Sequence, residues 1–154
     1  MQIPINIKEK LLIELKKRNK NIIITKKIDR YVQDLSLMSE PKSIINTYLN
    51  IVKQVNSNYQ TPFAQIKLIN FLTSLTNCKN ILEIGTYKGF TSAYLALNTP
   101  LYTKIYTCEI NDENCSQAIK LWKDLKIDNK IILQKGEALN TINELNGRIK
   151  FDLI

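Results

Sequence analysis

The stretch that decides the fold runs from Lys79 to Pro100 and reads K-N-I-L-E-I-G-T-Y-K-G-F-T-S-A-Y-L-A-L-N-T-P. Its first part, Asn80 to Ile84, is a short apolar run, which is typical of a strand buried on both faces of a sheet. The run ends at Gly85, and Gly89 follows shortly afterwards. Apolar residues then recur at helical spacing. The stretch therefore predicts a strand, a tight glycine turn and a helix, in that order.

The glycine turn has the features of a nucleotide pocket. Glycine tolerates a positive φ angle and lets a ligand approach the backbone closely, and the helix that follows directs free N–H groups back at the turn. Tyr87 stands where the dinucleotide motif G-x-G-x-x-G has its middle glycine, which blocks the approach of a pyrophosphate. We therefore expect a ligand with a nucleoside and no diphosphate, such as S-adenosylmethionine. An ordinary strand–turn–helix without a ligand is the alternative.

Length and composition favour one cytoplasmic domain. The chain has 154 residues, enough for a single core. It contains no apolar run long enough to cross a membrane and no secretory signal at its N-terminus. Its three cysteines show no metal-binding spacing, and an odd number argues against a disulfide framework. The chain has no histidine, which excludes nucleophile systems that depend on histidine and argues against most zinc sites.

The net charge of +8 raises the question of a nucleic-acid partner. Lysine, isoleucine and asparagine are all abundant, as expected from an A/T-rich genome. The densest basic run, Lys16 to Lys20, is expected to end an exposed helix, where cations suit the helix dipole. The chain shows no aromatic-rich basic strand of the RNA-binding kind. We therefore expect neither nucleic acid nor a membrane as partner.

The N-terminal part of the chain is expected to be helical. Ser39-Glu40-Pro41 predicts a break between helices, and the polar segment Asn56–Pro62 predicts a loop. Amphipathic patterns predict helices over Glu9–Lys17, Asp29–Leu37, Pro41–Val55 and Phe63–Leu75. We expect residues 1–55 to form a helical cap or arm and residues 56–154 to form the cofactor-binding part.

Strands alternate with helices from residue 80 onward, which predicts a parallel, doubly wound sheet of the α/β class. The further strands are expected at Lys104–Ile110, Lys130–Lys135 and Phe151–Ile154. The helices between them are expected to begin at Asn111 or Asp112 and at Ala138. The last strand has barely begun when the sequence ends, and such sheets need both faces covered. We therefore expect an incomplete sheet of about four strands.

Two carboxylates stand out against this framework. Glu109 lies at the carboxyl end of the second strand, where an acidic residue can accept hydrogen bonds from both ribose hydroxyls; a surface glutamate at a strand end is the alternative. Glu83 lies inside an apolar strand, where a carboxylate is costly unless it is paired or touches a ligand. A buried structural glutamate bonded to backbone N–H groups is the alternative for Glu83.

From about residue 29 to residue 154 the chain resembles the N-terminal two-thirds of the cation-dependent, S-adenosylmethionine-dependent O-methyltransferases, the caffeoyl-CoA and catechol O-methyltransferase family. The segments match that family in order and spacing, and they are Ser39-Glu40-Pro41, Thr61-Pro62, Leu82-Glu83-Ile84-Gly85-Thr86, Gly89-Phe90-Thr91, Tyr106-Thr107-Cys108-Glu109-Ile110, Gly136-Glu137-Ala138-Leu139 and Lys150-Phe151-Asp152-Leu153-Ile154. The resemblance implies a Rossmann-like class I methyltransferase fold with N-terminal helices.

The resemblance also implies cofactor-binding roles by position. It places Thr61 at the methionine portion of S-adenosylmethionine, Glu83 at its amino group, Gly85 and Thr86 as backbone contacts, Thr91 at its carboxylate, Glu109 at its ribose, and Glu137 and Ala138 at its adenine. The roles of Glu83 and Glu109 agree with what their places in the strands suggest.

The chain departs from the family pattern at several positions. Ile66 follows Gln65 where the family commonly has glycine, and Glu137 stands where aspartate is usual. In the family, the segment after Phe-Asp-Leu-Ile supplies a metal-binding aspartate and a lysine proposed as general base, and a further metal pair and the rest of the acceptor pocket follow. Asp152 precedes the metal position and does not replace it. We therefore expect no catalytic and no metal-ligating residue in this chain.

The resemblance implies transfer of a methyl group from S-adenosylmethionine to a hydroxyl of a small molecule. In the full-length family a divalent cation such as Mg²⁺ orients the acceptor and lowers its pKa. This chain is expected to carry the donor-binding half only, so a homodimer or a complementing C-terminal fragment is the expected kind of partner. The alternative is a non-catalytic truncated remnant, or an interaction module that at most binds S-adenosylmethionine.

Overall fold

A computed structural model describes residues 26–54 and 59–154 of the protein. In chain order its longer elements are α2 (Lys26–Leu37), α3 (Lys42–Gln54), α4 (Phe63–Leu75), β1 (Asn80–Ile84), α5 (Phe90–Asn98), β2 (Lys104–Glu109), α6 (Asp112–Asp124), β3 (Ile131–Lys135) and α7 (Ala138–Leu145). The helix expected over Glu9–Lys17 lies outside the described residues. Among the helices in the described ranges, none is long and apolar enough to cross a membrane.

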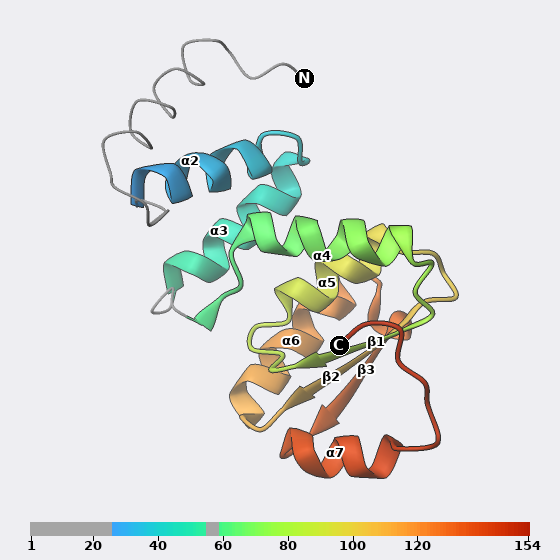
Figure 1. Ribbon diagram of the computed structural model, residues 1–154. Coiled ribbons are helices and arrows are strands. Elements are labelled where there is room, and N and C mark those ends of the chain that lie inside the picture. Colours follow the sequence, from blue (N-terminus) through green and yellow to red (C-terminus); the bar gives the residue numbers. More distant parts are fainter. Residues whose placement is uncertain (1–25, 55–58) are drawn as a thin grey trace, which may run out of the picture.

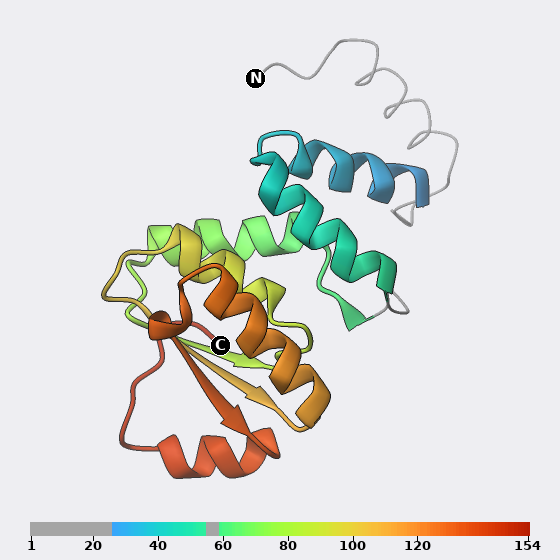
Figure 2. The same ribbon diagram turned by 180° about the vertical axis from the view of Figure 1, so that it is seen from behind.

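The three strands form a parallel sheet in the order β1-β2-β3. Parallel neighbours need a crossover, and here α5 and α6 provide it. In Figure 1, α5 and α6 lie on one side of the strands and α7 lies on the other. Figure 2 shows the same division from behind. Helices therefore cover both faces, and the prediction of a doubly wound α/β sheet is confirmed.

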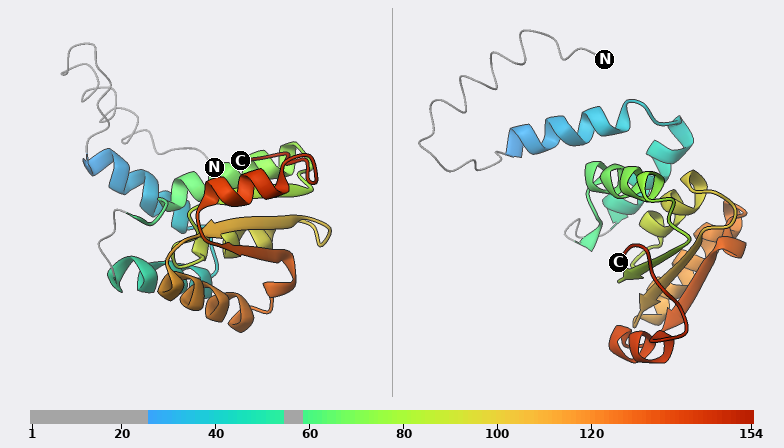
Figure 3. Two further views of the ribbon diagram at one scale, coloured as in Figure 1. Left: turned by 90° about the horizontal axis from the view of Figure 1, so that it is seen from below. Right: turned by 45° about the vertical axis from the view of Figure 1, so that its right-hand side comes forward.

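The chain returns to β1 after α7, and this return reverses the strand order. Leu153 forms a single parallel bridge with Ile81, and its carbonyl accepts a hydrogen bond of 2.9 Å from the amide of Leu82. In the right-hand view of Figure 3 the C-terminal segment runs beside β1, on the side away from β2. The expected fourth strand is thus present as one bridge pair. Ligands of doubly wound sheets bind beyond the carboxyl ends of strands near such a reversal.

The main core lies between the sheet and the two crossover helices. Ile81 and Ile105 project from neighbouring strands, and both are almost completely buried. They pack with Leu95 of α5 and with Ala118 and Trp122 of α6. Each fully buried large apolar side chain of this kind stabilises the fold by roughly 1.5–3 kcal/mol. This core fixes the distance between β1, β2 and the start of α5, where the glycine turn lies.

A second cluster joins the N-terminal helices to the α/β part. Tyr48 of α3 packs against Phe63 of α4 and Phe90 of α5, with ring centroids 5.1 Å apart in both pairs. Glu40 adds a polar link, because its Oε1 lies 2.9 Å from the Lys67 ammonium and accepts a 2.9 Å hydrogen bond from the Tyr94 hydroxyl. These contacts cross the boundary expected at residue 55, and that boundary stays a prediction.

One element end agrees with the expected one, and another differs for a local reason. Asn111 caps α6 as expected, since its side chain accepts a 3.0 Å hydrogen bond from the amide of Asn114. The third strand begins at Ile131 rather than at Lys130. Lys130 closes a 3₁₀ turn, because its amide bonds to the carbonyl of Ile127, and its side chain points back to the end of α5.

Candidate functional site

The turn between β1 and α5 is folded over the end of β2. Gly85 has a φ of +94°, and its amide and that of Thr86 donate to the carbonyl of Cys108 over 3.0 and 3.1 Å. Tyr87 has a φ of +51°, a left-handed conformation that costs a non-glycine residue of the order of 1–3 kcal/mol. A Cβ atom added at Gly85 would meet no atom within 4 Å. The backbone at Gly85 is therefore open to a ligand.

Gly89, at the end of the turn, serves packing rather than ligand access. A Cβ atom there would lie 2.7 Å from the Cβ of Ala118 and 2.8 Å from the Nε1 of Trp122. The carbonyl of Gly89 also accepts a 2.9 Å hydrogen bond from the Trp122 indole. The absence of a side chain lets α6 press directly on the start of α5, which holds the turn at the end of the sheet.

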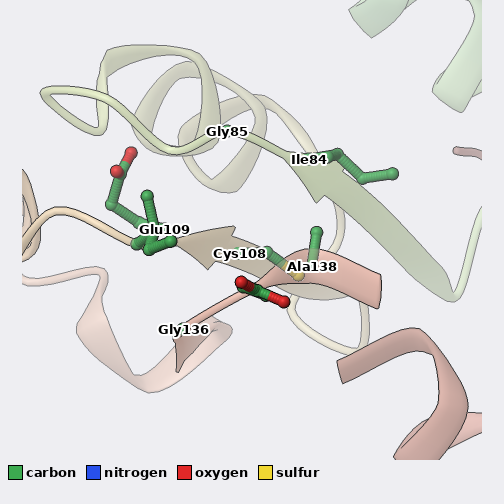
Figure 4. A pocket seen from close by; sticks show the side chains of 8 residues that line it. Ile84, Gly85, Cys108, Glu109, Gly136 and Ala138 are labelled. Carbon is green, nitrogen blue, oxygen red and sulfur yellow. The ribbon is translucent and has the colours of Figure 1, made fainter. Parts of the chain in front are cut away.

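Glu109 is a buried carboxylate held in place by two backbone amides. It is 9% exposed, so it is not the surface glutamate considered as the alternative. Its Oε2 accepts a 2.8 Å hydrogen bond from the amide of Tyr87, and its Oε1 accepts one of 2.9 Å from the amide of Asn111. Figure 4 shows the carboxylate pointing toward the glycine turn. A carboxylate has about four acceptor sites, so both oxygens retain capacity for a ligand hydroxyl.

Glu83 is half-buried and is held by hydroxyl groups. Its Oε2 accepts hydrogen bonds from the Ser92 hydroxyl at 2.6 Å and from the Thr107 hydroxyl at 2.5 Å. Burial raises the pKa of Glu83 from 4.5 to about 7, the two hydroxyl donors lower it, and the negative charge of Glu109 raises it further. The donors are side-chain hydroxyls and not the backbone N–H groups of the alternative, and the role of Glu83 toward a ligand stays a prediction.

A cavity of about 320 Å³ opens at the carboxyl ends of the three strands. This volume lies in the range of small-molecule sites. Figure 4 shows the lining, which comes from the ends of β1, β2 and β3 and from the start of α7. The lining residues are Ile84, Gly85, Cys108, Glu109, Ile110, Gly136, Glu137 and Ala138.

The cavity unites half of the expected cofactor-binding residues: Gly85, Glu109, Glu137 and Ala138 line it. Glu83 and Thr86 lie in a hydroxyl network, because Thr107 bonds to both of them. The other two expected residues, Thr61 and Thr91, are half-buried and do not line the cavity.

The remaining two positions flank the turn. Thr91 lies in the first turn of α5. The segment that contains Thr61 lies beside the turn, since the ring centroids of Tyr59 and Tyr87 are 6.2 Å apart. The structure therefore gathers the expected residues around the turn and the cavity beside it, and their individual roles stay predictions.

Several residues of the site were not expected from the sequence. Cys108, Ile110 and Gly136 line the cavity, and Ser92 and Thr107 hold Glu83. Thr107 lies directly opposite Glu83 in the strand register. The alternation of side chains along β2 would have placed Thr107 on the same face as Glu109, but the register that brings it to Glu83 cannot be read from one sequence.

Comparisons with known proteins agree with the fold. A model of the O-methyltransferase family matches residues 35–154. Over 128 residues the chain is 26% identical to caffeoyl-CoA O-methyltransferase of Medicago sativa, covering 82% of this chain and 52% of that protein. Over 108 residues it is 29% identical to catechol O-methyltransferase domain-containing protein 1 of Mus musculus, covering 70% and 41%.

A solved structure gives the same picture of the fold. The O-methyltransferase TomG of Streptomyces achromogenes, determined in complex with S-adenosylmethionine, superposes with a TM-score of 0.69 at 23% identity, covering 82% of this chain and 58% of that one. The chain spans about half the length of the curated relatives it matches.

Proposed function

Because the chain belongs to the O-methyltransferase family, we propose that it carries the S-adenosylmethionine-binding half of an enzyme that methylates a hydroxyl group of a small molecule. The observation that carries the proposal is the buried Glu109 carboxylate, held by two backbone amides at the end of β2 beside an open glycine turn. When bound, S-adenosylmethionine supplies an electrophilic methyl group on a sulfonium centre. The residues of this chain would bind and orient that donor, and correct orientation of the reactants lowers the barrier to such a transfer.

The cavity fits the nucleoside end of the cofactor. Glu109 offers two oxygens to the two ribose hydroxyls, and their backbone anchors keep them from rotating away. Glu137 and Ala138, on the opposite side of the cavity, would border the adenine. Gly85 has no side chain, and no atom lies within 4 Å of the place where its Cβ atom would be. The sugar would therefore be able to approach the backbone there.

The side of the glycine turn that faces α5 fits the methionine portion of the cofactor. Glu83 is an acidic group near the start of α5 and suits an ammonium ion. The free amides at the first turn of α5, which contains Thr91, suit a carboxylate. The amide of Thr86 already donates to Cys108 and its carbonyl accepts from Gly89, so a contact with the cofactor would add to these bonds. Thr61 would lie against the methionine chain. The ammonium of the ligand would thus face the Glu83 carboxyl group, and its carboxylate would face the amides at the start of α5.

The methyl acceptor and the divalent cation belong to the part of the family that this chain does not match. Among residues 26–54 and 59–154 there is no cluster of three or more metal-ligating side chains. The resemblance places the metal ligands and the acceptor pocket after Phe151–Ile154. We therefore expect cofactor binding without turnover from this chain alone. The alternative, an interaction module that binds the cofactor without catalysis, is supported by the same coverage of about half of its relatives.

The part of the family's domain that this chain does not match has a suitable place beside β1. A smaller cavity of about 150 Å³ lies between α7 and the C-terminal segment, and Ile154 next to it is 78% exposed. Apolar surface of this kind marks a place where more protein packs. Its lining is mostly apolar and consists of Leu82, Ile142, Leu145, Asn146, Ile149, Phe151 and Ile154. We expect the acceptor-binding part of the family's domain to pack here; a complementing C-terminal fragment and a homodimer are the two partners that would supply it.

Titration calorimetry with S-adenosylhomocysteine, the stable product, tests the cofactor site. We expect a dissociation constant in the micromolar range, about 8 kcal/mol of binding free energy. Glu109→Gln keeps the shape of the side chain and should weaken binding at least tenfold. Glu113→Gln, the same change at an exposed position of α6, should bind as the wild type does. A folded wild-type chain that does not bind would refute the proposal.

A further inference from the structure

Three buried hydroxyl groups form a hydrogen-bond network around Glu83. Thr86 and Thr107 bring their hydroxyl oxygens within 2.6 Å of each other, and Thr107 continues to Oε2 of Glu83. Ser92 reaches the same oxygen from α5. Ser92 and Thr107 are both 0% exposed. Hydroxyls buried to this degree need partners, and a carboxyl oxygen that accepts from both makes them donors toward Glu83.

The hydroxyl network leaves one side of the carboxyl group available. Both hydrogen bonds go to Oε2, and no described residue donates a hydrogen bond to Oε1. Two donors from different elements, β2 and α5, fix the rotation of the Glu83 side chain more firmly than one could. Oε1 is therefore presented in a constant direction from a half-buried site at the start of α5.

Among residues 26–54 and 59–154, no positively charged group acts on the pKa of Glu83. The titratable neighbours that act on it are Glu109 and Cys108, both on β2, and its neighbour on α5 is the neutral Ser92. The thiol of Cys108 is neutral, because burial and the field of Glu83 raise its pKa. Burial raises the pKa of Glu83 to about 7, which brings the titration of this carboxyl into the neutral pH range.

We propose that Ser92 and Thr107 are positioning residues that hold Glu83 with Oε1 facing the ammonium group of the cofactor, and that binding of this ammonium displaces the proton from Glu83 to solvent. This inference rests on the proposed function. The ammonium donates an N–H to Oε1, and the Glu83 proton passes to the buffer, so charge and protons balance. Cofactor binding is then coupled to pH through this one side chain.

The direction of the pH effect follows from this exchange. The ammonium stabilises the carboxylate, so the pKa of Glu83 is lower in the complex than in the free protein. Below the pKa of the free protein, binding must first remove a proton, and affinity falls by up to tenfold per pH unit. Above it, affinity is constant. Loss of either hydroxyl donor removes support for the carboxylate and therefore raises the pKa of Glu83. The affinity then begins to fall at a higher pH.

Calorimetry with S-adenosylhomocysteine between pH 5.5 and 8.5, repeated in buffers of different ionisation enthalpy, measures both the affinity and the protons released. For Thr107→Val and Ser92→Ala we expect the midpoint of the affinity profile to rise by at least half a pH unit, with affinities near that of the wild type at pH 8.5. Thr107→Ser should restore the wild-type profile. Thr103→Val removes another buried hydroxyl, whose partner is the Cys78 carbonyl at the far end of β2, and should leave the profile unchanged.

A second measurement does not depend on the ligand. The carbon-13 shift of the Glu83 carboxyl in the free protein reports its titration, which should move to higher pH in Thr107→Val. Variants that bind more weakly by one factor at every pH would overturn the inference and leave the cofactor site intact. A folded wild-type chain that binds at no pH would overturn the proposed function and this inference together.

Discussion

Gly89 is the glycine at which an added side chain would meet the closest contacts. Its φ of +77° alone disfavours a side chain, and a Cβ atom would collide with Ala118 and Trp122. The atoms it would meet belong to a packed helix and cannot move away freely. We expect Gly89→Ala to lower the free energy of unfolding by about 3–4 kcal/mol, the sum of overpacking and left-handed strain, as measured by urea denaturation.

Gly147 offers a matched control for that prediction. Its φ of +73° is nearly the same, and an added Cβ would meet nothing within 4 Å. Gly147→Ala should therefore show the conformational cost alone, about 1 kcal/mol. If both substitutions lower the free energy of unfolding equally, contact with α6 is not the reason that position 89 requires glycine.

The sequence predicts the two carboxylates of the site better than it predicts the hydroxyl groups around them. Glu83 and Glu109 stand out because a charge inside or at the end of an apolar strand is unusual. Ser92 and Thr107 do not stand out, because serine and threonine are common in helices and strands. Their importance depends on the register of β1 against β2 and on the place of α5, both of which are tertiary properties.

At the scale of elements, the C-terminus of α5 depends on a lysine from another part of the chain. Lys130 is buried, and its ammonium donates to the carbonyls of Ala96 and Thr99 and to the Thr99 hydroxyl. Carbonyls at the end of a helix have no partner within the helix, and a cation suits the dipole there. Lys130 thus anchors the end of α5 to the start of β3.

Lys130→Met should lower the free energy of unfolding by about 2 kcal/mol, because it removes charge-assisted hydrogen bonds and leaves buried carbonyls unpaired. Thermal unfolding followed by circular dichroism would measure it. Lys120→Met, at an exposed position of α6, should change stability by less than about 0.5 kcal/mol. Equal stability of the two variants would contradict the anchoring role.

The element types of the α/β part were predictable, and the start of β3 shows the limit of predicting element ends. Apolar periodicity and the glycine turn indicate β1, α5, β2 and α6 correctly, since each buries a regular face. The start of β3 was predicted one residue too early. A lysine at that position looks like an ordinary strand residue, and only the folded chain shows that its side chain reaches α5.

At the scale of the molecule, alternation of strands and helices was enough to predict the sheet, and the reversal at β1 agrees with the strand expected at the C-terminal end. The relation of the N-terminal helices to the sheet was not predictable. It depends on aromatic residues from α3, α4 and α5 that meet only after folding. Periodicity identifies the buried face of each helix without showing which helix it faces.

The aromatic cluster makes a prediction about the whole molecule. Tyr48 is buried against Phe63 and Phe90, and Phe90 begins α5 at the glycine turn. We expect one cooperative thermal transition, and we expect Tyr48→Ala to lower the free energy of unfolding by about 3 kcal/mol and to weaken cofactor binding, since α5 loses its support. Tyr102→Ala, at a side chain 57% exposed, should change neither. Two transitions, with Tyr48→Ala shifting only one and leaving binding intact, would instead mean that the N-terminal helices fold as a separate cap.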